Sequence, residues 1–242
     1  MLRRAQYLLI ALFGMWVIAL ICPRAGLATT TTDTITVNNP SFETASGPFD
    51  GTADTTGLYN YSITGWNITG SDGTWIPNLS YTPQFFTPSL VPDGSHVAWS
   101  NGGVISQALG VTLASTGTYS LTVYVGHRND YWPTVLFPNS SYLIGLFTGT
   151  DFALDGTNVL VYDYEPVNQG QWQAVTLTYT PKSGDIGKPL GIFLYSAGTQ
   201  VDFDKVSLTR TYEVVPIPAS ILLLGSGLAG LGLLRFRRKI TS

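Results

Sequence analysis

The stretch between residues 29 and 213 is built from short segments in which apolar and polar residues alternate. In the run YSLTVYV at 119–125, the odd-numbered residues are aliphatic or aromatic, and two of the three even-numbered ones, Ser120 and Thr122, are polar. This period of two is typical of a β-strand with one face in a core and the other toward solvent. No window of twelve or more residues in this stretch shows the 3.6-residue period of an amphipathic helix. The pattern therefore restricts this part of the chain to an all-β fold.

Turn residues separate these segments at short intervals. Clusters such as Asp93-Gly94-Ser95 and Asn101-Gly102-Gly103 stand between β-rich runs, and they favour tight turns. Many short strands in one domain of this length predict a single β-sandwich of the jelly-roll type. The strands are expected at Thr34–Val37, His96–Ser100, Val104–Ala108, Thr118–Val125, Tyr142–Phe147, Val159–Tyr164, Trp172–Thr180, Leu190–Tyr195 and Val201–Thr209.

Residues 1–28 have the three-part order of a secretion signal. Arg3 and Arg4 form a basic start, the run Tyr7–Cys22 is uncharged and apolar, and Gly26 and Ala28 give a small-residue exit. The sequence predicts export by the secretion machinery and cleavage by signal peptidase after residue 28. An uncleaved membrane anchor is the alternative.

Residues 214–242 carry a second apolar run. The 21 residues from Val214 to Leu234 hold no charge, and as a helix they span roughly 31 Å, the thickness of a bilayer core. A basic tail follows at once, which predicts a transmembrane helix with its tail in the cytoplasm. The positive charges of this tail are those of Arg235, Arg237, Arg238 and Lys239.

The end of the chain resembles a known family of sorting signals. Val215, Pro216, Ile217 and Pro218, followed by the glycine-rich apolar run and the basic tail, resemble the PEP-CTERM signal, with Ile217 where the family has Glu. The resemblance implies export, membrane anchoring through the C-terminal helix, processing by an exosortase, and release to the outer surface or to the polysaccharide matrix of a biofilm. A plain C-terminal membrane anchor is the alternative.

The charges are distributed unevenly along the chain. The whole sequence has 12 Lys and Arg against 15 Asp and Glu. Residues 29–213 hold all the acidic residues and only five of the basic ones, a net charge of −10. This balance excludes a nucleic-acid-binding surface. The single cysteine, Cys22, lies in the predicted signal, so a disulfide scaffold and a cysteine-based metal cluster are also excluded.

The central domain has a resemblance of its own. The run Asn39–Glu43, the pair Gly65-Trp66 and the closing run Val201–Leu208 resemble galactose-binding-like jelly rolls, the fold of many carbohydrate-binding modules. The resemblance implies a structural calcium ion held by Glu43 near the first strand and Asp204 in the last. Such a site suits Ca²⁺, which takes six to eight oxygen ligands. Alternatively, Glu43 caps a turn and Asp204 is merely solvated.

Sugar recognition requires flat apolar rings together with polar groups that reach hydroxyls. The segment at 127–132 combines both kinds of side chain directly after a predicted strand. Core packing of the aromatic residues, and a plain surface pair of Arg128 with Asp130, are the alternatives. The candidate sugar-binding residues are His127, Arg128, Asn129, Asp130, Tyr131 and Trp132, with Trp75, Tyr81 and Trp99.

Signals of catalysis are weak in this sequence. His96 and His127 are the only histidines, and the chain has no nucleophile elbow, phosphate loop or dinucleotide fingerprint. Acidic pairs such as Asp202 and Asp204 are interpreted as solvated strand residues. The prediction is therefore a noncatalytic protein that binds exopolysaccharide. The alternatives are a structural matrix protein that acts through protein contacts and a secreted polysaccharide-active enzyme.

Overall fold

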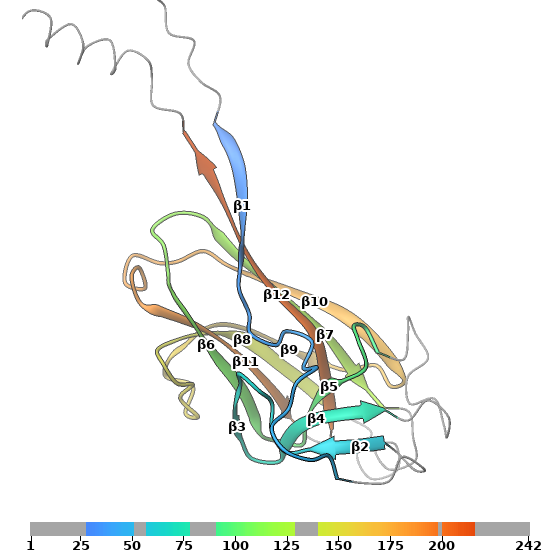
Figure 1. Ribbon diagram of the computed structural model, residues 1–242. Helices are drawn as coiled ribbons and strands as arrows, with labels where there is room; N and C mark the ends of the chain where they lie inside the picture. Colours follow the sequence, from blue (N-terminus) through green and yellow to red (C-terminus); the bar gives the residue numbers. More distant parts are fainter. Residues whose placement is uncertain (1–27, 51–56, 78–90, 129–139, 198–199, 216–242) are drawn as a thin grey trace, which may run out of the picture. The chain divides into compact units, whose positions relative to one another are not determined.

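The computed structural model describes residues 28–50, 57–77, 91–128, 140–197 and 200–215 (Figure 1). The chain divides into two compact units, residues 31–212 and residues 1–30 together with 213–242. The first of these units contains the β-sandwich. Residues 1–27 of the predicted signal peptide and 216–242 of the predicted sorting segment lie outside the described residues. Within the described ranges, no helix has the length and apolarity needed to cross a membrane.

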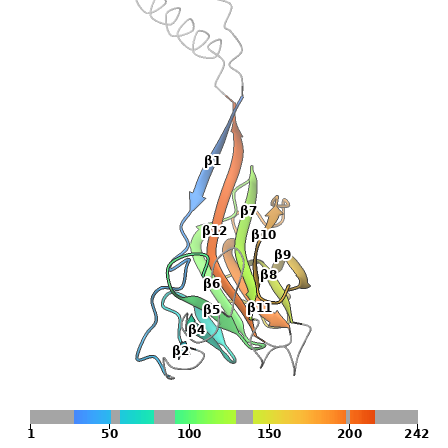
Figure 2. The same ribbon diagram turned by 90° about the vertical axis from the view of Figure 1, so that its right-hand side faces the viewer.

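Twelve strands in the described residues form two sheets, which confirms the predicted all-β sandwich (Figures 1 and 2). The seven-stranded sheet has the order β10-β7-β12-β5-β4-β2, with β1 paired to β12, and its strands are β1 (Thr29–Ile35), β2 (Gly57–Asn60), β4 (Asp72–Pro77), β5 (Val97–Ser100), β7 (Thr118–His127), β10 (Gln171–Tyr179) and β12 (Val201–Val214). The five-stranded sheet has the order β3-β6-β11-β8-β9, and its strands are β3 (Asn67–Thr69), β6 (Val104–Thr112), β8 (Ser141–Thr148), β9 (Val159–Pro166) and β11 (Pro189–Ala197).

The main core lies between the two sheets, as the alternation in β7 predicts. Leu121, Val123 and Val125 are fully buried there, and residues of the facing sheet such as Ile144 and Leu194 belong to the same cluster. Fully burying an aliphatic side chain of this size stabilises the fold by about 1.5–3 kcal/mol. The core therefore fixes which side of each strand faces inward.

Both sheets also carry apolar side chains on their outer faces. In β5, Ala98 packs into the core while Val97 and Trp99 belong to a second cluster. In β11, Ile192 packs into the core while Phe193 belongs to a third. Since successive side chains of a strand point to opposite faces, the second and third clusters cover the outer faces of the two sheets. These outer faces are where the molecule departs from a simple sandwich.

Three strands were not predicted from the sequence. They are β2, β3 and β4, which have three to six residues; β2 and β4 do not alternate in hydropathy, and β3, with three residues, is too short to show a period. All but one of the residues of β4 are buried, so polar Asp72 and Thr74 lie inside together with Trp75. The first strand also begins earlier than predicted, at Thr29, and ends at Ile35.

Candidate functional site

One row of paired residues crosses the seven-stranded sheet. From β4 to β10, the register aligns Gly73 with Trp99, Trp99 with Asp202, Asp202 with Gly126, and Gly126 with Trp172. Residues directly opposite each other in antiparallel strands point to the same face. The carboxyl group of Asp202 therefore lies on the outer face of this sheet, in one row with two indole rings.

Glycine at two positions of this row makes room for the indoles. A Cβ atom on Gly126 would lie 2.7 Å from Cε3 of Trp172, so the Trp172 ring extends across β7, the strand between β10 and β12. A Cβ atom on Gly73 would lie 1.9 Å from the carbonyl oxygen of Asn60. A Cβ atom at either position would therefore force its neighbour to shift, the Trp172 ring at Gly126 and the Asn60 backbone at Gly73. The two glycines thus allow Trp172 and Trp99 to flank Asp202.

A chain of hydrogen bonds leads from Asp202 to an arginine. The Gln200 amide Nε2 donates to Oδ1 of Asp202 at 2.7 Å, and its Oε1 accepts from Nη1 of Arg128 at 3.2 Å. The same Nη1 donates to the hydroxyl of Tyr59 at 2.8 Å, and the guanidinium carbon lies 4.3 Å from the ring centre of Trp75. Arg128 is thus held by hydrogen bonds and a cation–π contact, and Gln200 connects it to Asp202.

The aromatic rings around this chain are packed against one another. Tyr59 stacks on Trp75 at 5.8 Å with 6° between the planes, and it meets Trp99 edge-on at 6.1 Å. The indole N–H of Trp99 donates to the carbonyl of Thr74 at 3.0 Å. Trp75 is fully buried and Trp99 is 4% exposed. The rings are therefore fixed in place and are not presented as an open platform.

This arrangement suits proton transfer beside a developing positive charge. Asp202 is fully buried, and a carboxyl group can donate or accept a proton at a positioned substrate atom. Aromatic faces attract cations, and more strongly when water is excluded. The sequence-based interpretation of Asp202 and Asp204 as solvated strand residues is wrong, because both are fully buried.

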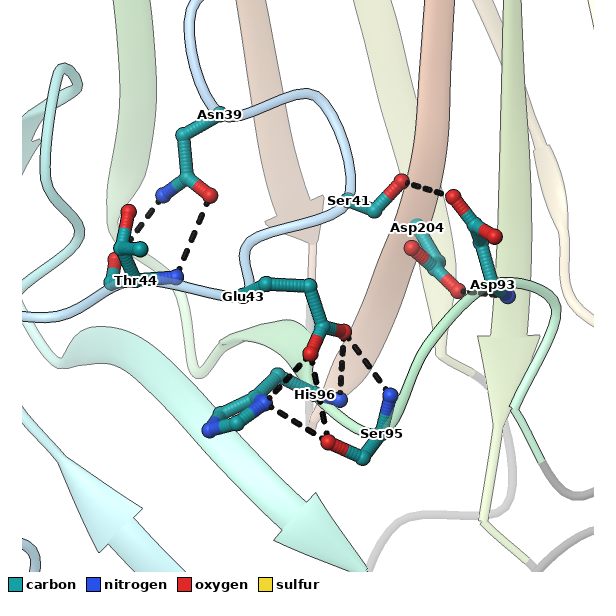
Figure 3. A network of polar contacts seen from close by, with 8 residues as sticks. All are labelled: Asn39, Ser41, Glu43, Thr44, Asp93, Ser95, His96 and Asp204. Atoms are coloured by element: carbon teal, nitrogen blue, oxygen red, sulfur yellow. Dashed lines mark hydrogen bonds and ion pairs between the residues drawn. The ribbon is translucent and has the colours of Figure 1, made fainter.

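A second polar network lies beside the last strand (Figure 3). Oε1 of Glu43 accepts from the backbone N–H groups of Ser95 and His96, both at 2.8 Å, and Oε2 lies 2.8 Å from Nδ1 of His96. Burial raises the pKa of Glu43, but these hydrogen bonds outweigh it and hold the pKa below its ordinary value. Glu43 therefore caps the 95–96 backbone, as one of the two sequence interpretations proposed.

Asp204 belongs to the same network but makes different contacts. Its Oδ2 accepts from the backbone N–H of Asp93 at 2.8 Å, and its Oδ1 accepts from that of Lys205 at 2.6 Å. Burial raises the pKa of Asp204 to about 8, and the charges of Asp93 and Glu43 add to this. Figure 3 shows the Glu43 carboxylate directed toward His96 and away from Asp204. The described residues contain no group of three or more acidic, His or Cys side chains able to hold a metal ion.

The structure brings together only part of the predicted sugar-binding set. Trp75, Trp99 and Arg128 meet on the outer face of the seven-stranded sheet. Arg128 is only 5% exposed, so it is not the surface residue that the alternative pair with Asp130 required. His127 is directed elsewhere, with Nε2 3.1 Å from the hydroxyl of Ser140, which precedes β8 of the other sheet. The remaining candidates lie outside the described residues: Tyr81, Asn129, Asp130, Tyr131 and Trp132.

Four residues of this site were not among the candidates predicted from the sequence: Tyr59, Trp172, Gln200 and Asp202. One local signal was present for Asp202, which stands between the apolar Val201 and Phe203 in a strand. Its neighbours in the row come from four other strands, and their alignment follows only from the register.

A buried carboxyl group among indole rings is able to transfer a proton to a bound molecule, and the family comparison points to an enzyme. Residues 33–209 match the family model described as HpiC1-like, HpiC1 cyclase, and the chain belongs to this family. A cyclase from Fischerella sp. TAU has a similar structure, with 22% identity and a TM-score of 0.56 over 74% of this chain and 98% of that one. A second structure of a cyclase from the same organism, in complex with 4-(1H-indol-3-yl)butan-2-one, has 21% identity and a TM-score of 0.55 over 75% of this chain and all of that one. No curated protein matches the chain in sequence.

These findings correct the family and function predicted from the sequence. The chain is a member of a cyclase family, so its identification as a PEP-CTERM protein with a carbohydrate-binding-module ectodomain is wrong. The prediction of a noncatalytic exopolysaccharide-binding protein is wrong for the same reason. The physical error was to interpret Trp75 and Trp99 as candidate sugar platforms. Trp99 is instead buried opposite Asp202, and Trp75 is buried against Tyr59 and Arg128.

The predicted localisation is corrected as well. Exosortase sorting and a C-terminal membrane helix were inferred from residues 214–242, of which only Val214 and Val215 lie in the described residues. Val214 is the last residue of strand β12, so the predicted helix does not begin there. The family match identifies a cyclase and gives no support to an anchored, exosortase-sorted protein. A C-terminal helix anchor is thus unsupported.

Proposed function

We propose that this protein catalyses an acid–base cyclisation of a compact aromatic substrate, with Asp202 as the proton-transferring group. The observation that carries the proposal is the position of Asp202, fully buried and in register between Trp99 and the glycine under Trp172. Membership of the cyclase family supports the reaction class. The function rests on this chain's own side chains and requires no redox partner.

The chemistry is a proton-neutral isomerisation. In its acid form, Asp202 donates a proton to an unsaturated carbon of the substrate, and the resulting carbocation is attacked by a double bond of the same molecule, which forms the new carbon–carbon bond. Loss of a proton from the cyclised cation to the Asp202 carboxylate gives a product of unchanged mass. The rings of Trp75, Trp99 and Trp172 lower the energy of the cation by cation–π attraction. The hydrogen bond from Nε2 of Gln200 keeps Oδ1 in place, so the carboxyl group presents a fixed geometry.

The substrate class follows from the lining of the site. Indole side chains stack well on flat aromatic rings, and an apolar body avoids the cost of burying polar groups. The Fischerella cyclase structures, one in complex with 4-(1H-indol-3-yl)butan-2-one and another with (3Z)-3-(1-methyl-2-pyrrolidinylidene)-3H-indole, support an indole-type molecule. We infer an alkenyl-substituted indole as the substrate type.

The test compares the purified full chain with Asp202→Asn on a panel of alkenyl indoles. Product is detected as an isomer of unchanged mass by chromatography and mass spectrometry, and binding of 4-(1H-indol-3-yl)butan-2-one is measured by calorimetry. We expect Asp202→Asn to retain binding and to lose about 10²–10⁴-fold in turnover, the usual contribution of a general acid–base group. Asp163→Asn on β9 serves as the matched control and should leave turnover unchanged. Equal turnover in the wild type and Asp202→Asn contradicts the proposal.

Within the class of β-sandwiches, we propose a jelly roll as the finer fold assignment. Its support is the strand order, in which sequence-distant strands such as β12 and β5, or β6 and β11, are neighbours. This crossing pattern is typical of antiparallel double-sheet folds with Greek-key connections.

A structural calcium ion remains a prediction. Burial of Asp204 beside Asp93 favours a cation there, whereas the contacts of Glu43 with residues 95–96 oppose the predicted Glu43–Asp204 pair. Thermal melts with Ca²⁺ and with a chelator decide the question. If calcium is bound, the chelator should lower the midpoint of thermal unfolding by several degrees. In a domain of this size, a loss of a few kcal/mol in the free energy of unfolding corresponds to a shift of several degrees. An unchanged midpoint rules out a stabilising ion.

A further inference from the structure

A pocket of about 700 Å³ opens on the outer face of the five-stranded sheet, on the other sheet from Asp202. Its floor is apolar and comes from strands β6, β8, β9 and β11. A volume of this size falls in the range of small-molecule sites, roughly 300–1,000 Å³. The floor includes Val104, Leu143, Val159, Phe193 and Tyr195.

One wall is the connection between β8 and β9, and it is held in place by its own contacts. The amide of Asn158 donates to the carbonyls of Thr148 at 2.9 Å and Asp151 at 2.8 Å, and its Oδ1 accepts from the N–H of Ala153 at 3.0 Å. Phe152 packs against Phe193 with their ring centres 4.5 Å apart. The wall is therefore formed before any ligand arrives.

Two large apolar side chains on this face remain open to solvent. Leu154 is 72% exposed on the loop, and Tyr162 is 61% exposed on β9, although both line the pocket. Two exposed apolar residues that line one hollow are typical of a ligand site. They offer apolar contact to a ligand without any change in the fold.

The charge around the pocket is negative. None of its described lining residues is basic, and Asp155 stands among them. The backbone N–H and the hydroxyl of Thr157 hold the pKa of Asp155 below its ordinary value, so Asp155 stays ionised at neutral pH. The opposite wall of the pocket includes Gly103. Behind it lies the carboxyl group of the fully buried Asp72, whose Oδ2 is 1.9 Å from the place that a Cβ atom on Gly103 would take.

We propose that this pocket binds a small organic cation, a protonated amine on an aromatic body. The floor and loop supply π faces from Phe152, Phe193, Tyr162 and Tyr195, which attract ammonium groups and stack on aromatic rings. Asp155 supplies the opposite charge. The large excess of acidic residues in residues 29–213 raises the local concentration of cations around it.

The experiment uses 2-phenylethylammonium as the probe and neutral 2-phenylethanol as its matched control. Both are titrated into the full chain near neutral pH and followed by calorimetry. We expect saturable binding of the amine and at least about tenfold weaker binding of the alcohol, since the two differ only in the charged group. Equal affinity for the two probes, or no saturable amine binding, overturns the proposal.

Variants at an exposed position locate the bound probe without disturbing the fold. Leu154→Lys places a positive charge at the rim and should weaken amine binding at least about tenfold, while Leu154→Gln changes polarity alone and should weaken it less. Asp202→Asn should leave amine binding unchanged. Binding lost in Asp202→Asn but retained in Leu154→Lys places the amine in the other site and overturns the proposal. The cyclase assay on Leu154→Lys should remain at the wild-type level, so the two proposals stand or fall separately.

Discussion

The outer faces of the two sheets carry aromatic side chains in opposite ways. On the seven-stranded sheet, Trp75 and Trp99 are buried, and Trp99 lies opposite a buried carboxyl group that is connected to Arg128 through Gln200. On the five-stranded sheet, Tyr162 is largely exposed at an open pocket whose described lining has one ionised carboxylate, Asp155. A dry, rigid environment strengthens electrostatic effects on a reacting group, whereas an open pocket suits reversible binding. Similar residue types thus serve different purposes because their burial differs.

Removing one ring from each face gives the largest expected contrast. Trp75→Ala should lower the free energy of unfolding by about 3–5 kcal/mol, because it deletes a fully buried ring stacked on Tyr59. Tyr162→Ala should lower it by less than about 1 kcal/mol, because most of that ring already contacts water. Urea unfolding followed by circular dichroism measures both. Similar losses in the two variants would show that the faces do not differ in packing.

The acids near the two walls of the pocket should respond to pH with opposite signs. Burial raises the pKa of Asp72 to about 6, so the folded protein holds this proton to a higher pH than the unfolded chain. The stability from Asp72 is then complete below about pH 4 and is lost as the pH rises through 6, about 3 kcal/mol in all. Asp155, with its lowered pKa, contributes stability that is lost as the pH falls.

The measurement is the unfolding free energy of Asp72→Asn from pH 4 to pH 7. The variant should lose less stability than the wild type over this interval, since its amide does not titrate. Asp155→Asn is the matched control, and it should retain the wild-type decline between pH 4 and pH 7. Parallel profiles for Asp72→Asn and wild type would refute the buried, proton-holding state of Asp72.

A single methyl group tests how tightly the indoles are packed. Gly126→Ala brings a Cβ atom within 2.8 Å of the Trp172 ring and should lower the unfolding free energy by about 1–3 kcal/mol, as overpacking does. It should also displace the indole and reduce cyclase turnover. Gly184→Ala meets no atom within 4 Å and is the control. Unchanged stability and turnover in Gly126→Ala would mean that Trp172 does not lie over this glycine.

The smallest effect is expected from the connection between arginine and carboxyl group. Gln200→Met keeps the length of the side chain but removes both hydrogen bonds, and it should lower cyclase turnover by about tenfold, the equivalent of about 1.4 kcal/mol. The pH profile of turnover should shift with it, which loss of packing alone does not produce. Gln171→Met, at an exposed position of β10, is the control. A tenfold loss with an unshifted profile would assign Gln200 a packing role only.

Much of the fold was predictable because local patterns carry it. The alternation in β7 identified its inward face, and nine of the twelve described strands were expected near their observed positions. The strands β2 and β4 were not predicted because they are short and do not alternate in hydropathy, and β3 was not predicted because three residues are too few to show a period. In β4, polar Asp72 and Thr74 are buried by strands from distant parts of the chain, which no local pattern records.

The candidate site was predictable only in fragments. Trp75, Trp99 and Arg128 were selected for the chemistry of their side chains, but as parts of a sugar-binding surface. Asp202 was dismissed, because an acidic residue two positions from another in a strand is normally solvated. Its burial results from the pairing of β12 with both β5 and β7, together with the Trp172 ring that Gly126 admits from β10.

The sequence by itself determined that residues 29–213 fold as an acidic, all-β sandwich without disulfides, since alternation, turn residues and composition act locally or as sums over the chain. Only the tertiary structure decided that a carboxyl group from one strand, indoles from three others and an arginine directly after a fifth share one buried surface. The physical reason is strand register, which places distant residues opposite one another and is set by the packing of the whole core. Register thus places aromatic and acidic residues together in a candidate active site on one sheet and in an open pocket on the other.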